Sequence, residues 1–244
     1  MMMGGMDWQE RGAVTRVRNQ GQCGSCWAIA ATEAIEGNLF INSGELVDLS
    51  AEYLVDCDRG SAGCKGGSMD QAFSFVSKNG ICTNEDDPYT GGASECRCVP
   101  RVGIDDYVRV TPTVSALTRA VSRTPVAVAI EADARVFQFY KSGIIDSQSC
   151  GQNMDHGVLL VGFGYDQNQS YWRVKNSWGS DWGEDGYVRI SRDEGDVCGI
   201  LQQASYPVGA KNTINAEKTR QSVAQYTGAF AAVMRWVQDA LFSR

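Results

Sequence analysis

The chain has 244 residues, which is enough for one large domain or two small lobes around a sizeable core. Lys and Arg total 22 against 29 Asp and Glu, so the formal net charge is −7. This acidic balance argues against nucleic acid or an anionic membrane as the main partner.

The start of the chain lacks the basic residues and apolar core of a signal peptide, since it reads Met-Met-Met-Gly-Gly-Met. No later segment has the length and apolar character needed to span a bilayer. We therefore expect residues 1–6 to be a start artefact.

The first half of the chain has a helical pattern. Ser25 is placed to cap a helix, Ser50 a second one, and Ser68 a third that ends before Gly80. The first of these helices carries an apolar stripe with a spacing of four residues, formed by Trp27, Ala31, Ile35 and Leu39.

The second half changes to short apolar runs that are typical of strands. These runs cover residues 126–130, 158–161, 171–174 and 187–190. The change lies near residues 110–125, which predicts a helical lobe at about 10–110 and a β lobe at about 111–208. The fold class is therefore α+β.

Residues 209–244 form a separate C-terminal extension. Its apolar residues recur at three- and four-residue steps and predict a helix with one apolar face: Val223, Tyr226, Phe230, Val233, Val237 and Leu241. We expect this helix to pack on the rest of the protein or to form a frayed tail. The alternative is a helix that binds a membrane surface or a partner.

The main chemical signal is a cysteine paired with the single histidine of the chain. Cys26 follows Cys23-Gly-Ser, and His156 is the one imidazole available to activate its thiol. Asn176 stands in an Asn-Ser-Trp-Gly run, and Gln20 precedes Cys26 by six residues. Read alone, the Cys-x-x-Cys pattern also fits a redox protein, in which Cys26 would pair with Cys23.

Over about residues 7–208, this order and spacing resembles the papain family of cysteine peptidases, specifically the cathepsin L-like members. Because members of this family are usually made with a signal and a pro-segment, the resemblance implies a mature-form segment or a truncated gene product. The resemblance implies a helical lobe and a β-barrel-like lobe with the active-site cleft between them, and chain ends that cross to the opposite lobe. It also implies a thiol endopeptidase, because no insertion with paired histidines follows Cys98.

The resemblance assigns a role to each catalytic residue. Cys26 would be the nucleophile, at a helix start that lowers its pKa, and His156 the acid and base. Asn176 would orient the imidazole, and Gln20 would donate to the oxyanion. The resting pair is expected to be thiolate and imidazolium.

The same resemblance implies a substrate-binding surface and a main selectivity pocket with an apolar preference. Gln203 would stand at the closed end of this pocket, between walls of Met69, Ala129 and Met154. The other implied substrate-binding residues are Gly24, Gly66, Gly67, Asp155 and Trp178.

Nine cysteines leave eight for disulfides once Cys26 is set aside, which indicates an oxidising compartment, although nine buried thiols in a cytosolic protein remain the alternative. The resemblance implies the pairs Cys23–Cys64, Cys57–Cys96 and Cys150–Cys198, and leaves Cys82 and Cys98 as a further bridge. Because Cys96 and Cys98 are two residues apart, their partners could be exchanged.

The remaining expectations concern the setting of the enzyme. Asn168 begins a glycosylation sequon on an expected turn. We expect a monomer without metal or cofactor, in a lysosome or vacuole or secreted, that acts on polypeptides and is inhibited by cystatin-like proteins or a propeptide. The alternative from another class is a catalytically silent papain-fold binding or storage protein.

Overall fold

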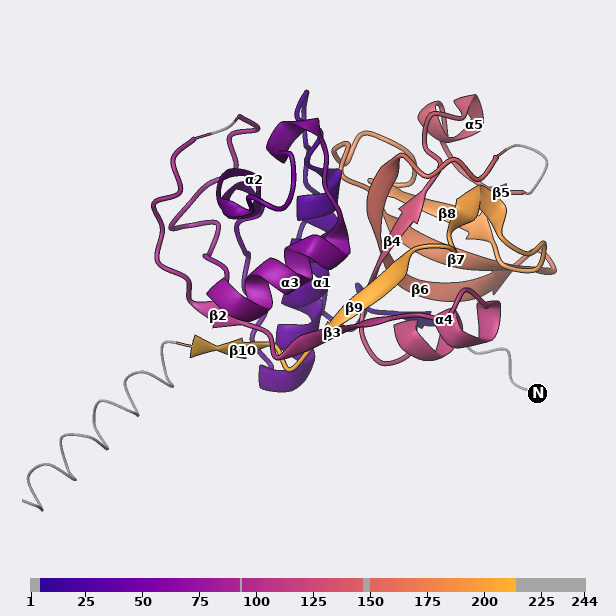
Figure 1. The fold of residues 1–244 in the computed structure, drawn as a ribbon. Coiled ribbons are helices and arrows are strands. Elements are labelled where there is room, and N and C mark those ends of the chain that lie inside the picture. Colours follow the sequence, from indigo (N-terminus) through magenta and orange to yellow (C-terminus); the bar gives the residue numbers. More distant parts are fainter. Residues whose placement is uncertain (1–4, 93, 147–149, 214–244) are drawn as a thin grey trace, which may run out of the picture. The chain divides into compact units, whose positions relative to one another are not determined.

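The computed structural model describes residues 5–92, 94–146 and 150–213. The described residues up to Lys211 form one compact unit, with a helical part on one side and a large sheet on the other (Figure 1). The helix expected in the C-terminal extension lies outside the described residues.

The helical part is built around α1 (Cys26–Ser43). It also contains α2 (Ala51–Cys57), the 3-10 turn η1 (Gly63–Lys65) and α3 (Met69–Asn79). Every residue of α1 from Trp27 to Leu39 is buried, because α2 and α3 contact it as well as strands of the sheet. The predicted apolar stripe is thus correct, but α1 is a central helix rather than one with a solvent-facing side.

The three predicted caps have different outcomes. The Ser50 hydroxyl accepts a hydrogen bond from the backbone N–H of Tyr53 at 2.9 Å and so caps α2. Ser25 and Ser68 occupy the cap positions of α1 and α3, but their side chains make no capping hydrogen bond. Gly80 ends α3 as predicted.

The sheet has eight strands, in the order β3-β9-β4-β6-β7-β8-β5, with β1 paired to β6. These strands are β1 (Met6–Asp7), β3 (Asp106–Arg109), β4 (Val126–Ile130), β5 (Ile144–Ile145), β6 (His156–Asp166), β7 (Gln169–Lys175), β8 (Tyr187–Ser191) and β9 (Ala204–Val208). The four apolar runs of the sequence lie within β4, β6, β7 and β8.

The remaining elements are short. Two helices accompany the sheet, α4 (Val114–Val121) and α5 (Arg135–Gln138), with a 3-10 turn η2 (Val197–Gly199). Strands β2 (Val102–Gly103) and β10 (Lys211–Asn212) form a separate two-stranded sheet.

The fold is α+β, but the sheet does not close into a barrel. Its two terminal strands, β3 and β5, are not paired with each other. Strand β3 turns instead to the helical part, where the Tyr107 ring lies 5.9 Å from that of Phe73 in α3. The expected barrel-like lobe is therefore an open sheet whose edge strand packs on a helix.

The N-terminal segment crosses to the sheet, as the resemblance implied. Strand β1 pairs with β6 through Met6 and Phe163 and through Asp7 and Gly162. Position 162 needs a glycine, because a Cβ there would collide with the backbone of β1. At the other end, the backbone N–H of Ala210 donates to Asn38 of α1 at 3.1 Å.

Four disulfides are present, and all nine cysteines lie in the described residues. The pairs are Cys23–Cys64, Cys57–Cys96, Cys82–Cys98 and Cys150–Cys198, which leaves Cys26 free. The exchange of partners between Cys96 and Cys98 does not occur. Because Cys23 is bonded to Cys64, the redox pairing of Cys23 with Cys26 is also wrong.

Candidate active site

Cys26 is the first residue of α1, and its thiol is the free one. Burial raises the pKa of the Cys26 thiol above its ordinary value, and the negative charge of Asp155 adds to this increase. Backbone N–H groups of Gly157, Trp27 and Cys26 itself lower the pKa, but by less than burial raises it.

His156 lies at the start of β6, and Asn176 directly follows β7, its antiparallel neighbour. This pairing brings the two side chains together, and the imidazole Nε2 lies 2.7 Å from Asn176 Oδ1. Since an amide oxygen can only accept, Nε2 carries the hydrogen and Nδ1 is the nitrogen left for acid and base chemistry.

The surroundings of the imidazole are apolar. The ring centroids of Trp178 and Phe137 lie 5.0 Å and 6.4 Å from that of His156. Burial lowers the pKa of His156, while the hydrogen bond that it donates to Asn176 and the charge of Asp155 raise it. The two rings thus cover the imidazole, and both His156 and Asn176 are buried.

The two pKa shifts differ from the sequence-based expectation. Burial favours the neutral thiol of Cys26 and the neutral imidazole of His156, whereas the helix start alone suggested a strongly lowered thiol pKa. The reason is that α1 is a central helix, so the cost of removing charge from water exceeds what the helix end supplies.

Gly157 joins the sheet side of the site to α1. A Cβ at this position would lie 3.3 Å from the backbone carbon and oxygen of Cys26 and 3.1 Å from Met69 Sδ. The residue that follows the imidazole therefore lies directly against the nucleophile's own backbone.

Gln20 is held by two neighbours. Its Nε2 donates to the carbonyl oxygen of Cys23 at 3.1 Å, and its Oε1 accepts from the Ser177 hydroxyl at 2.8 Å. The backbone N–H of Ser177 also donates to Asn176 Oδ1 at 2.8 Å. One short segment thus orients both the imidazole partner and the proposed oxyanion donor.

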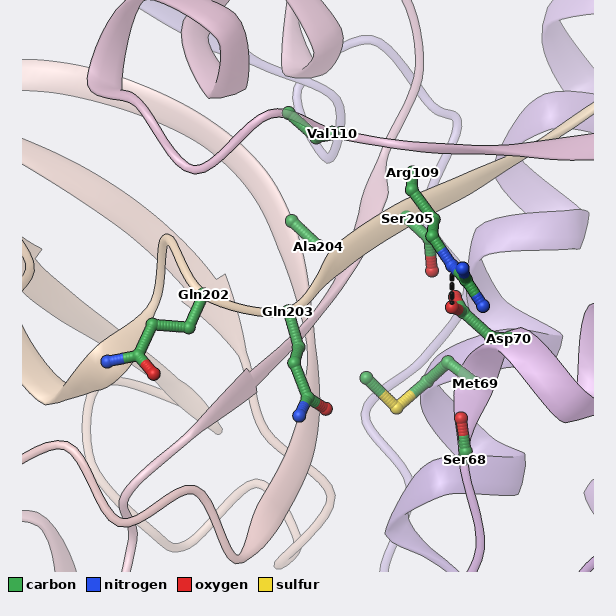
Figure 2. Close-up of a pocket in the computed structure, with 9 residues that line it drawn as sticks. All are labelled: Ser68, Met69, Asp70, Arg109, Val110, Gln202, Gln203, Ala204 and Ser205. Atoms are coloured by element: carbon green, nitrogen blue, oxygen red, sulfur yellow. Dashed lines mark hydrogen bonds and ion pairs between the residues drawn. The ribbon is translucent and has the colours of Figure 1, made fainter.

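A pocket of about 380 Å³ lies between the start of α3 and strand β9. Figure 2 shows Met69 and Gln203 facing one another across it. Its lining residues are Ser68, Met69, Asp70, Arg109, Val110, Gln202, Gln203, Ala204 and Ser205.

This lining differs in part from the expected one. Ala129 and Met154 are not among the residues that line the pocket. Ala129 instead donates its backbone N–H to the carbonyl oxygen of Gln203 at 2.9 Å, and Met154 packs against Gly199. The side chain of Gln203 is solvent-exposed, so the pocket is open at the position that was expected to be closed.

The predicted glycines also have distinct roles. The backbone of Gly66 is used within its own turn, since its N–H donates to Gly63 at 3.2 Å and its carbonyl accepts from Ala62 at 2.9 Å. Among the described residues, nothing is hydrogen-bonded to the backbone of Gly67. A Cβ on Gly67 would lie 2.5 Å from the Trp27 indole, so this position requires glycine.

Gly24 and Asp155 support the site from either side. The backbone N–H of Gly24 donates to Cys64 at 2.9 Å, and a Cβ there would lie 2.6 Å from the same oxygen. The Asp155 carboxylate accepts from the backbone N–H groups of Ala132 at 2.7 Å and Asp133 at 3.2 Å. The Gly24 backbone and the Asp155 carboxylate are therefore both used in hydrogen bonds within the protein.

Residues 3–208 match the sequence profile of the papain family of cysteine proteases. The chain belongs to this family. It is 48% identical over 214 residues to germination-specific cysteine protease 1 of Arabidopsis thaliana and 44% identical over 215 residues to mouse procathepsin L. Each alignment covers 83% of this chain, but only 57% and 64% of these relatives.

The papain-family fold is also found by structural comparison. The bromelain protease of Ananas comosus, in complex with the E64 inhibitor, superposes with a TM-score of 0.80 and 40% sequence identity. The match covers 84% of this chain and 98% of the bromelain chain.

The sequence analysis missed several residues of this papain-family site. Ser177 could have been found, because it lies between Asn176 and Trp178 in the same motif. Phe137 and Tyr89 could not, because only tertiary packing brings them to the imidazole and to Gln20.

Three further expectations concern features of the described residues. Among them, no helix has both the length and the hydropathy that a membrane crossing requires, and no cluster of acidic, histidine or cysteine side chains suits a metal ion. Asn168 lies exposed at the turn between β6 and β7, with a left-handed φ of 66°.

Proposed function

We propose that this chain is a thiol endopeptidase that hydrolyses peptide bonds through an acyl-enzyme on Cys26. The observation that carries the proposal is the bond between His156 Nε2 and Asn176 Oδ1 at 2.7 Å, with Gly157 against Cys26. It leaves Nδ1 of the single imidazole for proton transfer to and from the free thiol.

The reaction begins when the thiol passes its proton to His156 Nδ1. Burial penalises either charge alone, but this transfer creates two opposite charges side by side, which stabilise each other. Backbone N–H groups lower the pKa of Cys26, and the Asn176 hydrogen bond raises the pKa of His156. Both effects favour the charged pair.

Cys26 Sγ then attacks the substrate carbonyl carbon and forms a C–S bond. The oxyanion accepts hydrogen bonds from Gln20 Nε2 and from the backbone N–H of Cys26. As the C–N bond breaks, His156 gives its proton to the leaving amine. His156 next removes a proton from water, which attacks the thioester, releases the acid and restores the thiol.

Substrate selection is assigned to the pocket between α3 and β9. Met69, Val110 and Ala204 give it apolar surface, and Gln203 adds a neutral amide. We propose a preference for an apolar residue there over Arg. The unpaired backbone of Gly67, rather than Gly66, is the better placed group to pair with an extended substrate.

The test of activity is covalent labelling with E-64 together with peptide hydrolysis. The wild-type chain should incorporate one equivalent of the epoxide on Cys26 and cleave internal peptide bonds. Cys26→Ala should do neither, because deletion of a nucleophile costs many orders of magnitude in kcat. A folded wild-type chain that neither labels nor hydrolyses would support the catalytically silent alternative instead.

The pocket preference has its own test. Gln203→Glu should raise kcat/KM for an Arg peptide relative to a matched Leu peptide by a few-fold, because the new carboxylate can pair with a guanidinium. Solvent exposure of this side chain limits the gain. Gln202→Glu is the neighbouring control on the same pocket. An unchanged Arg to Leu ratio in the Gln203 variant would remove this residue from the selectivity pocket.

The location, partners and modification of the enzyme are part of the same proposal. Four disulfides support a lysosomal, vacuolar or secreted location. We propose residues 1–208 as the peptidase domain, polypeptides as substrates, and cystatin-like proteins or a propeptide as inhibitors. Asn168 is proposed as a glycan site because it is exposed on a turn.

A further inference from the structure

Tyr89 connects the two parts of the proposed oxyanion hole. Its hydroxyl donates to the backbone carbonyl oxygen of Gln20 at 2.9 Å, and it also forms a short hydrogen bond with the Ser25 hydroxyl. Because the Tyr89 proton is given to Gln20, Ser25 is the donor in the second bond. The phenol thus ties residue 20 to the residue directly before Cys26.

Ser25 provides independent support for the importance of this contact. Its position before α1 and its residue type favour a helix cap, yet its side chain caps nothing. The hydroxyl is fully buried and is used on Tyr89 instead. The first turn of α1 therefore has no side-chain cap, and the Ser25 hydroxyl is hydrogen-bonded to this phenol.

The segment that carries Tyr89 is anchored by a buried carboxylate of α2. Glu52 is 1% exposed and accepts the backbone N–H groups of Thr90 at 3.1 Å and Gly91 at 3.2 Å. It also accepts the Thr90 hydroxyl. The backbone N–H of Tyr89 itself donates to Asn84 at 3.3 Å. Two side chains, those of Glu52 and Asn84, therefore hold the backbone around the phenol.

Burial raises the pKa of the Tyr89 phenol, and the charges of Glu52 and Cys26 add to this increase. The hydroxyl therefore remains protonated throughout the pH range in which the proposed peptidase would work. A permanent donor can hold the Gln20 carbonyl at every stage of the reaction.

We propose that Tyr89 is a positioning residue that sets the spacing between the two oxyanion donors, Gln20 Nε2 and the Cys26 N–H. This inference rests on the proposed peptidase function. The physical reason is that a donor pair stabilises the transition state only when both groups are already aimed at the place where the oxyanion forms. Ser177 orients the Gln20 side chain, whereas Tyr89 holds its backbone.

The test is Tyr89→Phe, which removes one oxygen and keeps the ring. With an amide substrate whose acylation limits turnover, kcat should fall about tenfold, while KM stays within about twofold, since the contact acts mainly in the transition state. Alkylation of Cys26 by iodoacetamide should keep the wild-type rate, because that displacement forms no oxyanion. A lower kcat with an unchanged alkylation rate distinguishes a role in the oxyanion hole from general damage to the nucleophile.

A double variant adds a second readout. Gln20→Ala alone should lower kcat by roughly 10²-fold. Adding Tyr89→Phe to it should cost less than about twofold more, because no donor pair then remains to be spaced. Fully additive losses would overturn the proposal.

Tyr53→Phe is the matched control, because Tyr53 is a buried tyrosine of the neighbouring helix α2, and it should leave kcat and alkylation unchanged. If Tyr89→Phe fails to fold, Glu52→Gln replaces it, and should give the same loss of kcat with unchanged alkylation. Wild-type kcat in a folded Tyr89→Phe variant, or an equal loss in alkylation, would overturn the inference. A wild-type chain that does not hydrolyse peptides would instead refute the proposed function.

Discussion

The charge of the Cys26–His156 pair depends on a few contacts with neighbouring residues. Burial raises the pKa of Cys26 and lowers the pKa of His156, and both shifts oppose charge separation. The opposing contributions come from backbone N–H groups on the thiol and from Asn176 on the imidazole. Each of these contacts should therefore affect the pH range of activity as well as its rate.

Asn176 offers the sharpest test at this scale. Its hydrogen bond raises the pKa of His156, so Asn176→Ala should lower that pKa and move the acid limb of the kcat/KM profile to lower pH. A shift of one unit would also cost about tenfold on the plateau, because tenfold fewer resting pairs would hold the proton on the imidazole. Asn176→Asp should move the limb the opposite way, because a carboxylate favours the imidazolium more strongly. Profiles of kcat/KM against pH for the three enzymes check the prediction, and a limb at one common pH would contradict it.

At the scale of secondary structure, each helix start has its own energetic role. Ser50 caps α2 by accepting from Tyr53, whereas Ser68 stands before α3 without a capping bond. Ser25 stands before α1 and bonds to Tyr89. Three serines in equivalent sequence positions therefore differ in their hydrogen bonds, because tertiary contacts decide where each hydroxyl points.

This difference predicts unequal costs for the same substitution. Ser50→Ala should lower the free energy of unfolding by about 1 kcal/mol, the typical value of a lost cap. Ser68→Ala should cost only a few tenths of a kcal/mol, since it removes no such bond. Urea unfolding of both variants beside the wild type measures the two values. Equal losses of unfolding free energy in the two variants would mean that the Ser50 cap does not stabilise α2.

Across the whole molecule, buried ion pairs connect the sheet to the central helix. Lys175 at the end of β7 lies 2.7 Å from Glu33 of α1, and both side chains are almost fully buried. Arg18, in the segment before α1, pairs in the same way with Glu36. Burial alone would lower the pKa of Arg18, but Glu36, Glu33 and Asp48 raise it overall. These charges are tolerated because each has an opposite partner.

The pair between Lys175 and Glu33 predicts strong coupling. Lys175→Met should destabilise the protein by about 3–5 kcal/mol, because it leaves a buried carboxylate without its cation. The double variant Lys175→Met/Glu33→Leu should recover much of this loss, since no uncompensated charge remains. Lys211→Met is the surface control: Lys211 and Asp105 are 59% and 61% exposed, so its cost should stay below about 1 kcal/mol. Denaturant unfolding that shows no recovery in the double variant would contradict this account.

Local sequence signals predicted much of the fold and the catalytic pair that we propose. The single histidine pointed to the base proposed for Cys26, and periodicity located the strands that became β4 and β6. Ser50 and Gly80 marked a helix start and a helix end that the structure has. Such signals work because they depend on near neighbours in the chain.

Only the tertiary structure decided how these parts act together. It paired Cys57 with Cys96, left the sheet open at β3, and placed Tyr89 on Gln20. It also reversed the expected pKa shift of Cys26, because α1 is buried on every side. Burial, pairing and donor geometry depend on segments that lie far apart along the chain and meet only when it folds, so no local pattern contains them.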